Sequence, residues 1–235
     1  MKRLVLLICL ALCVSLFVGG TARGDSAAPV EKGSRVFFGH YEQDNDASNG
    51  PEPVEWLVLD RKDDGSLLLI SVYGLDAMPF ITPLDKVVWE KCTLRKWLNQ
   101  DFFSAAFTEE EKKTVQENLT DNSDKQGNEK FKKLTQSDTK DRVFILSYTE
   151  ASEYLTEKDD LACFPTEYAK AQGAFVNESN GKCVWWLRSP GSYLNWATRV
   201  NHYGVLGTVQ ADSADVCVRP VLWVSGPDAV SVSPE

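Results

Sequence analysis

Side chains that could do acid–base or nucleophilic chemistry are scarce in this chain of 235 residues, which holds only two histidines, His40 and His202. No histidine, cysteine and carboxylate set has metal-ligand spacing, and no nucleophile elbow, phosphate-binding loop or HExxH motif occurs. His40 lies in a strand-like segment, where a lone histidine is more often structural than a general base. We therefore predict no catalytic residue, no metal site and no cofactor, and a protein that is not an enzyme.

One acidic group follows His40, where Asp44, Asp46 and Glu52 fall in a loop rich in Asn, Gly and Pro. Calcium prefers oxygen ligands, but these three carboxylates do not have the EF-hand spacing. We favour a solvated acidic loop, and a bound calcium ion is the alternative.

The cysteines divide into two groups. Cys9 and Cys13 lie in the N-terminal apolar run, and the rest of the chain holds Cys92, Cys163, Cys183 and Cys217. An even number in an exported chain is compatible with disulfides, and four cysteines allow three pairings, among which the sequence does not choose. Buried free thiols are the alternative, and the lack of a CxxC pair argues against zinc.

The N-terminus predicts export. Basic residues 2 and 3 precede an apolar run at 4–18 and a small-residue stretch that ends at Gly24. This is the pattern of a cleaved signal peptide, which we place at residues 1–24. A run of roughly 15 residues is shorter than the ~20 of a spanning helix, so no membrane span is expected after cleavage. Because Leu12 is not small, the segment before Cys13 is a poor lipobox. We expect a secreted, cell-surface or periplasmic protein without a lipid anchor.

The charge balance restricts the partners. The chain carries 34 acidic and 25 basic residues, a net charge of −9, and loss of Lys2, Arg3 and Arg23 with the signal peptide lowers it to −12. A field of that sign argues against nucleic acid and anionic membranes as partners.

The remaining pattern indicates one α+β domain at residues 33–225, between a polar leader at 25–32 and a polar tail at 226–235. Strand-like runs are expected at 36–41, 54–60, 66–73 and 142–147, and strands and turns at 182–224. From Thr93 the period becomes helical, with Leu94, Trp97, Leu98 and Phe102 on one face. Capping boxes at Thr108 and Ser147 predict helices toward 118 and through 155, and another helix is expected at 166–173. Residues 118–140 are polar and predict an exposed loop or insertion. With helices in the middle and strands at both ends, we expect the two ends of the domain to pair in one sheet.

Two motifs near the C-terminus, WWLRSPG at 185–191 and VRPVLWV at 218–224, combine aromatic residues with arginine. Aromatic faces can stack on sugars, and arginine can clamp a carboxylate or phosphate. Alternating aromatics in strands are more often core, and an arginine among apolar residues is more often a half-buried structural ion pair. We therefore predict structural roles for Trp185, Trp186, Arg188, Arg219 and Trp223.

The segment between these motifs is the predicted binding surface. If it is a strand that enters a turn, Leu194, Trp196, Thr198 and Val200 share one face and Tyr193, Asn195 and Arg199 share the other. Its composition is typical of recognition surfaces. The candidate ligand-binding residues are Tyr193, Asn195, Trp196, Arg199, Asn201, His202 and Tyr203. An ordinary polar hairpin is the alternative.

The chain resembles an uncharacterised family of bacterial exported domains. The resemblance rests on the two motifs and on landmarks at 38–43, 55–60, 94–99, 106–108, 141–147 and 165–169. The order of elements and the closing Val218, Arg219 and Pro220 are also similar to the C-type-lectin-like superfamily in its formylglycine-generating-enzyme branch. That resemblance implies a mixed, mostly antiparallel sheet, short helices in the middle and a long C-terminal loop region that presents a ligand surface.

The sequence departs from both well-known activities of that superfamily. Formylglycine-generating enzymes use a close pair of cysteines near the C-terminus, whereas between Arg188 and Arg219 this chain has only Cys217. The calcium-binding motifs of lectins are absent, because Val54 follows Glu52 and Pro53, and Asn195 precedes Trp196. The resemblance therefore implies neither copper-dependent oxidation nor calcium-mediated sugar binding.

We expect an exported adhesion or recognition module for a glycan, a cell-wall component or a surface protein. The alternatives are an oxidoreductase related to the formylglycine-generating enzymes and a purely structural envelope protein. Because the mixture of Tyr, Asn, Arg, His and Ser at 192–204 resembles codon-diversified segments of C-type-lectin-like proteins, we also formulate the hypothesis that a diversity-generating retroelement targets it.

Overall fold

A computed structural model describes residues 30–131, 134 and 136–232. The predicted signal peptide and most of the polar leader lie outside the described residues. Within the described part of the chain, no helix has the length and apolar character needed to cross a membrane.

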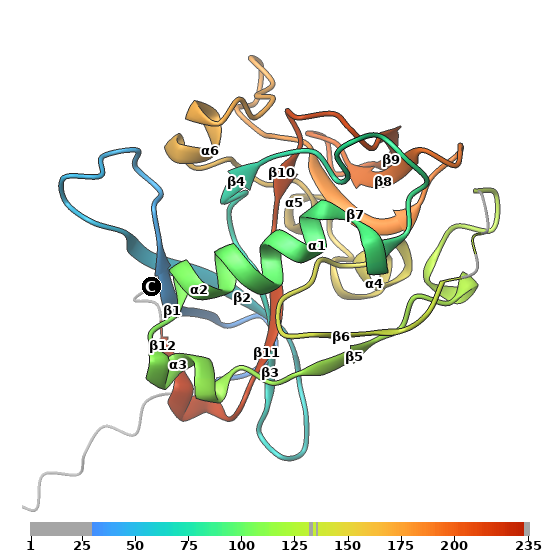
Figure 1. The fold of residues 1–235 in the computed structure, drawn as a ribbon. Coiled ribbons are helices and arrows are strands. Elements are labelled where there is room, and N and C mark those ends of the chain that lie inside the picture. The colour runs from blue at the N-terminus through green and yellow to red at the C-terminus, as the bar shows by residue number, and fades with distance from the viewer. Residues whose placement is uncertain (1–29, 132–133, 135, 233–235) are drawn as a thin grey trace, which may run out of the picture.

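The first sheet joins the two ends of the domain, as the sequence predicts (Figure 1). Its strand order is β11-β3-β2-β1-β12, and all its pairings are antiparallel. The strands are β1 (Arg35–Tyr41), β2 (Glu52–Arg61), β3 (Leu67–Ser71), β11 (Val221–Val224) and β12 (Ser231–Val232). Every residue of β3 is buried, which explains its uninterrupted apolar sequence. The segment predicted to be a polar tail contains the short helix η4 (Pro227–Ala229) and supplies the edge strand β12.

The second sheet holds the predicted binding segment. Its order is β4-β10-β7-β8-β9, and β10 and β7 are parallel while the other pairs are antiparallel. The strands are β4 (Asp76–Ala77), β7 (Trp185–Pro190), β8 (Trp196–Val200), β9 (Leu206–Gln210) and β10 (Cys217–Val218). Much of the expected C-terminal loop region is thus the three-stranded meander β7-β8-β9, which curls at the upper right of Figure 1.

A continuous helical segment covers Thr93 to Ala106, as the period predicts (Figure 1). It consists of α1 (Thr93–Trp97), the π-helical η2 (Leu98–Phe102) and α2 (Phe103–Ala106), and follows η1 (Trp89–Lys91). Leu94, Leu98 and Phe102 are completely buried, so the predicted face packs into the core.

Both capping boxes are present. The side chains of Thr108 and Ser147 each accept a hydrogen bond from the backbone N–H of the glutamate three residues later, and that glutamate's side chain accepts one from the backbone N–H of the Thr or Ser. They begin α3 (Glu109–Thr114) and α4 (Tyr148–Tyr154), and two further helices are α5 (Lys158–Leu161) and α6 (Glu167–Ala171). Helix α3 ends before the predicted position near residue 118, because Gln116 N donates to Trp223 O (2.9 Å) and the chain turns toward β11.

The prediction of a loop or insertion at 118–140 is wrong at its ends. Residues Asn118–Thr120 form β5, which pairs with β6 (Thr139–Asp141), and the short helix η3 (Asp124–Gln126) lies between them. Thr120, Asn122 and Thr139 are buried polar residues, and the Asn122 amide bonds to the Thr139 hydroxyl at 3.2 Å. The polar residues at the two ends of this segment therefore belong to a hydrogen-bonded pair of strands, β5 and β6, and not to an exposed loop.

The strand predicted at 142–147 is buried but irregular, with a single bridge between Phe144 and Val221. Its backbone bonds partly to β11 and β7, through Phe144 and Leu146, and partly to side chains. Asn99 Nδ2 donates to Val143 O at 2.8 Å, and Arg188 Nη1 donates to Ile145 O at 2.9 Å. The apolar run correctly indicated burial, but burial alone does not distinguish a strand from an irregular core segment.

The architecture is therefore a mixed α and β domain with mostly antiparallel, curled sheets and short helices, and one continuous hydrophobic core.

Candidate functional site

The predicted binding residues lie at two separate ends of β8. Trp196 begins the strand and Asn201 directly follows it, which places the two about 16 Å apart at the rise of a strand. At the first end, the Tyr193 and Trp196 rings meet edge to face with centroids 5.2 Å apart, and Tyr193 is 59% exposed. Asn195 is half-buried beside them, and its carbonyl accepts from Ala211 N.

The other end of β8 borders a pocket of about 230 Å³, which we call the His202 groove. It is lined by Phe175, Val184, Arg199, Asn201, His202, Thr208, Val209, Asp215 and Val216. The structure thus brings together three of the predicted residues, Arg199, Asn201 and His202, and separates them from Tyr193. Tyr203 flanks the groove, because its ring centroid lies 4.2 Å from that of His202.

Arg199 lies flat against the neighbouring strand. A Cβ on Gly207 would come within 3.3 Å of Arg199 Cζ, so only glycine leaves room for this guanidinium position without displacement. Nη1 donates to Val205 O at 3.3 Å, and no carboxylate of the described residues forms an ion pair with Arg199. Burial lowers the pKa of the Arg199 guanidinium below its ordinary value. A half-buried arginine without a counter-charge is available for an acceptor on a ligand.

Asn201 shapes the turn after β8. Its Oδ1 accepts from Tyr203 N and Val205 N, each at 2.9 Å, so most of its hydrogen-bonding capacity serves the backbone. The turn is also held from outside, since Asn180 Nδ2 donates to His202 O at 2.9 Å. Asn201 therefore positions its neighbours.

His202 stands among aromatic rings. Its ring centroid is 5.5 Å from that of Phe175, and its Nδ1 is buried without a hydrogen-bond partner among the described residues. Native proteins seldom leave a buried polar atom unpaired, and functional sites are one place where this occurs. Sequence reasoning missed Phe175 and Asp215, which reach the groove through the backbone bond from Phe175 N to Asp215 O (2.8 Å). No local signal identifies this pairing across 40 residues.

The aromatic residues assigned structural roles lie inside the protein. Trp185 and Trp186 are completely buried, and their indole nitrogens donate to Leu161 O and Met78 O. Trp223 is 8% exposed and lies beneath Lys62, whose Nζ is 3.9 Å from the ring centroid. These rings are part of the packing and present no platform to a ligand.

The two arginines differ in how they are compensated. Arg188 is buried in an ion pair with Glu150. Arg219 is equally buried, but it donates to the carbonyls of Ser71 (3.0 Å) and Asp160 (3.1 Å) and stacks 4.7 Å from the Trp185 ring centroid. Within the described residues it has no carboxylate partner, so the ion pair predicted for it is not formed there.

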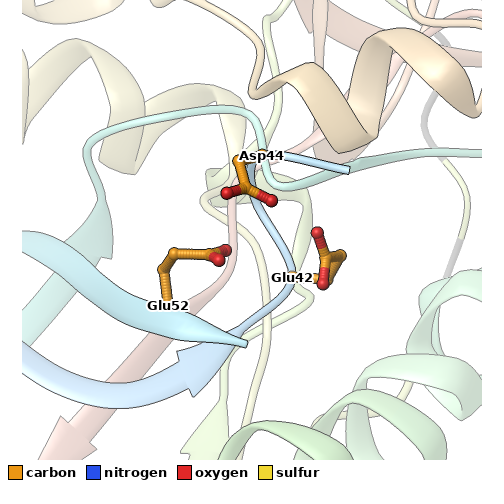
Figure 2. Close-up of side chains that lie close together, drawn as sticks. All are labelled: Glu42, Asp44 and Glu52. Atoms are coloured by element: carbon orange, nitrogen blue, oxygen red, sulfur yellow. The ribbon is translucent and has the colours of Figure 1, made fainter. Parts of the chain in front are cut away.

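The acidic loop gathers three carboxylates, but not the three that were predicted. Figure 2 shows the side chains of Glu42, Asp44 and Glu52 close together. One carboxylate oxygen of each residue lies within 4.8 Å of the other two. Asp46 instead donates its backbone N–H to Glu42 and Asp44, and Gln43 N donates to Glu52 at 2.7 Å. These bonds fix the three carboxylates within the loop, and calcium remains the alternative to a solvated acidic loop. His40 is exposed nearby on β1.

All four cysteines of the described chain are buried thiols. Cys92 begins α1, where its Sγ accepts from Arg95 N at 3.4 Å. The other three, Cys163, Cys183 and Cys217, lie together, with Cys163 Sγ 3.4 Å from Cys183 Sγ.

Comparison with known proteins gives a family but no characterised relative. A search of curated proteins and a search of solved structures each find no match. A family model described as a domain of unknown function, DUF6273, matches residues 64–226, from the turn before β3 to the residues after β11. The match includes both ends of β8 and the whole His202 groove, and it covers more than half of the chain. The chain belongs to the DUF6273 family.

Proposed function

We propose that this protein is an exported recognition module with a C-type-lectin-like domain, and that it binds a glycan of a cell wall or cell surface in the His202 groove. The observation that carries the proposal is the composition of the groove. The aromatic rings of Phe175 and His202 share the groove with Asp215 and with Arg199, whose guanidinium forms no ion pair with a carboxylate of the described residues.

Such a set suits a sugar. Pyranose rings offer apolar C–H faces for aromatic stacking and hydroxyl groups for arginine and carboxylate partners. Tyr203 is 57% exposed and extends the aromatic surface beyond His202, which supports recognition by an extended chain of sugars. Ligand pockets combine apolar walls with a few oriented polar groups in the same way.

The test is binding of the exported chain to an array of glycans and peptidoglycan fragments. Arg199→Ala and Tyr203→Ala should each weaken a hit about tenfold or more, as expected for a contact worth at least about 1.4 kcal/mol. Tyr193→Ala is the matched control, because Tyr193 is equally exposed but lies at the other end of β8. A hit that is lost in the control and kept in the other two variants would move the site to the Tyr193 end.

Two alternatives are less well supported. A purely structural envelope protein would be expected to bury the predicted surface, whereas Tyr193 and Tyr203 are both more than half exposed. An oxidoreductase gains one observation, the convergence of three cysteines, but their thiols are buried and none lines the His202 groove.

The retroelement hypothesis stays a prediction, which a template repeat and a reverse transcriptase gene beside this gene would support.

A further inference from the structure

Three cysteines that are distant in the sequence share one site in the core. Cys163 and Cys183 are joined twice, by the backbone bond from Cys183 N to Cys163 O (2.9 Å) and by the 3.4 Å approach of their sulfur atoms. Cys217 also lies beside Cys183, and both contact Gly74, where an added Cβ would come within 2.8 Å of Cys217 Cβ and 3.3 Å of Cys183 Sγ. The glycine leaves the space that the sulfur atoms fill.

One pair among the three is held together through the backbone as well as through its sulfur atoms. Cys183 N donates to Cys163 O at 2.9 Å and the two sulfur atoms are 3.4 Å apart, so a disulfide can bridge these two residues. Closing the bond moves the two sulfur atoms from 3.4 Å to about 2.05 Å, a change that side-chain rotation supplies. Cys92 is the N-cap residue of α1, and no sulfur contact with the other three is seen for it among the described residues.

We propose that Cys163 and Cys183 form a disulfide when the chain folds outside the cytoplasm, and that Cys92 and Cys217 remain buried thiols. Two S–H bonds break and one S–S bond forms. The S–S bond of an exchange partner, such as oxidised glutathione or an export-compartment oxidoreductase, breaks in return and takes up the two electrons and two protons, so the partner leaves as two thiols. This proposal rests on the export that the proposed function includes, but not on glycan binding in the His202 groove.

Burial indicates when the bond forms. It raises the pKa of the Cys163 and Cys183 thiols well above the ordinary value of 9.0, by more than the nearby Arg219 guanidinium lowers it. Exchange requires the thiolate, so it is slow in the folded protein. We therefore expect the bond to form during folding and to resist reductants until the domain opens.

The disulfide would stabilise one wall of the His202 groove. The closed loop runs over 20 positions, contains the short helix α6 and carries Phe175. Closing a loop of this size favours folding by roughly 100-fold in the equilibrium constant.

The direct test needs no variant. The full chain is exported to an oxidising periplasm, purified without reductant, denatured in iodoacetamide and digested for mass spectrometry. We expect a cross-linked peptide pair that contains Cys163 and Cys183, together with alkylated Cys92 and Cys217. Four alkylated cysteines, or a bridge that includes Cys92 or Cys217, would overturn the proposal.

A stability measurement supplies the matched comparison. The double variant Cys163→Ala/Cys183→Ala should lower the urea midpoint as much as reduction of the unfolded wild-type chain does, and reductant should not lower it further. Cys92→Ala should retain the full effect of reductant on the midpoint. A double variant that still responds to reductant would contradict the assignment.

Discussion

Arg188 is the most completely compensated buried charge in the described chain, which makes its ion pair with Glu150 a sharp test of the packing. All five guanidinium N–H groups have acceptors. Nε donates to Asn122 Oδ1, and the two terminal nitrogens donate to both carboxylate oxygens of Glu150 and to the carbonyls of Ile145 and Asp121. One side chain thus connects β7, α4 and the segment after β5.

The informative change is Glu150→Gln. Glutamine at N3 still completes the capping box with Ser147, so the substitution removes charge while it keeps the helix start. It leaves a cation whose side chain is 1% exposed without a counter-charge. Breaking a buried pair costs about 3–5 kcal/mol, and because the Glu150 side chain is 21% exposed, we expect a loss near 3 kcal/mol.

Urea unfolding followed by tryptophan fluorescence measures the loss. A drop of about 3 kcal/mol corresponds to a midpoint lower by about 1.5 M for a slope of about 2 kcal/mol/M. Glu153→Gln, an exposed position on the same helix, is the control and should change stability by less than about 0.5 kcal/mol. If Glu150→Gln costs no more than the control, the account of Arg188 is refuted.

Two further predictions concern a glycine and a buried acid. Gly39 has φ +67°, and an added Cβ would lie 2.6 Å from Ala106 O, so Gly39→Ala should lower the free energy of unfolding by about 3 kcal/mol or more. Gly50 also has a positive φ (+84°) but faces open space, so Gly50→Ala should lower it by only about 1–2 kcal/mol. Equal losses in thermal or urea unfolding would contradict this. Burial raises the pKa of Asp76 above 3.8 by more than its hydrogen bonds from Tyr41 and Ala77 lower it. The folded state then binds the proton more tightly, and this group's contribution to stability is lost as pH rises from about 3.8. The stability of Asp76→Asn minus that of wild type should therefore be more positive at pH 7 than at pH 4, and a pH-independent difference would count against this reasoning.

Local signals predicted the elements whose causes are local. The capping boxes at Thr108 and Ser147 and the helical face of Leu94, Leu98 and Phe102 depend on neighbours within one or two turns. The pairing of the domain's ends followed from the order of elements. By contrast, residues 142–147 look like a strand, but they are irregular, and their backbone bonds in part to the distant Asn99 and Arg188 side chains.

Only part of the candidate site was predictable, because some of its residues come together through long-range contacts. Tyr193, Arg199 and His202 were found by composition, but composition did not show that β8 separates Tyr193 from the other two. Phe175 and Asp215 join the groove through long-range backbone pairing that leaves no pattern in either segment. The two arginines had similar sequence surroundings, yet only Arg188 has an ion pair among the described residues.

Hydrogen exchange tests the central claim, recognition in the His202 groove, most directly. Exchange of the exported chain would be compared with and without array glycans and soluble peptidoglycan fragments at saturating concentration. The account predicts slower exchange at 173–176 and 199–209 with a binding glycan, and no change at 192–196. Protection confined to 192–196, or no protection by any of these probes, would contradict it.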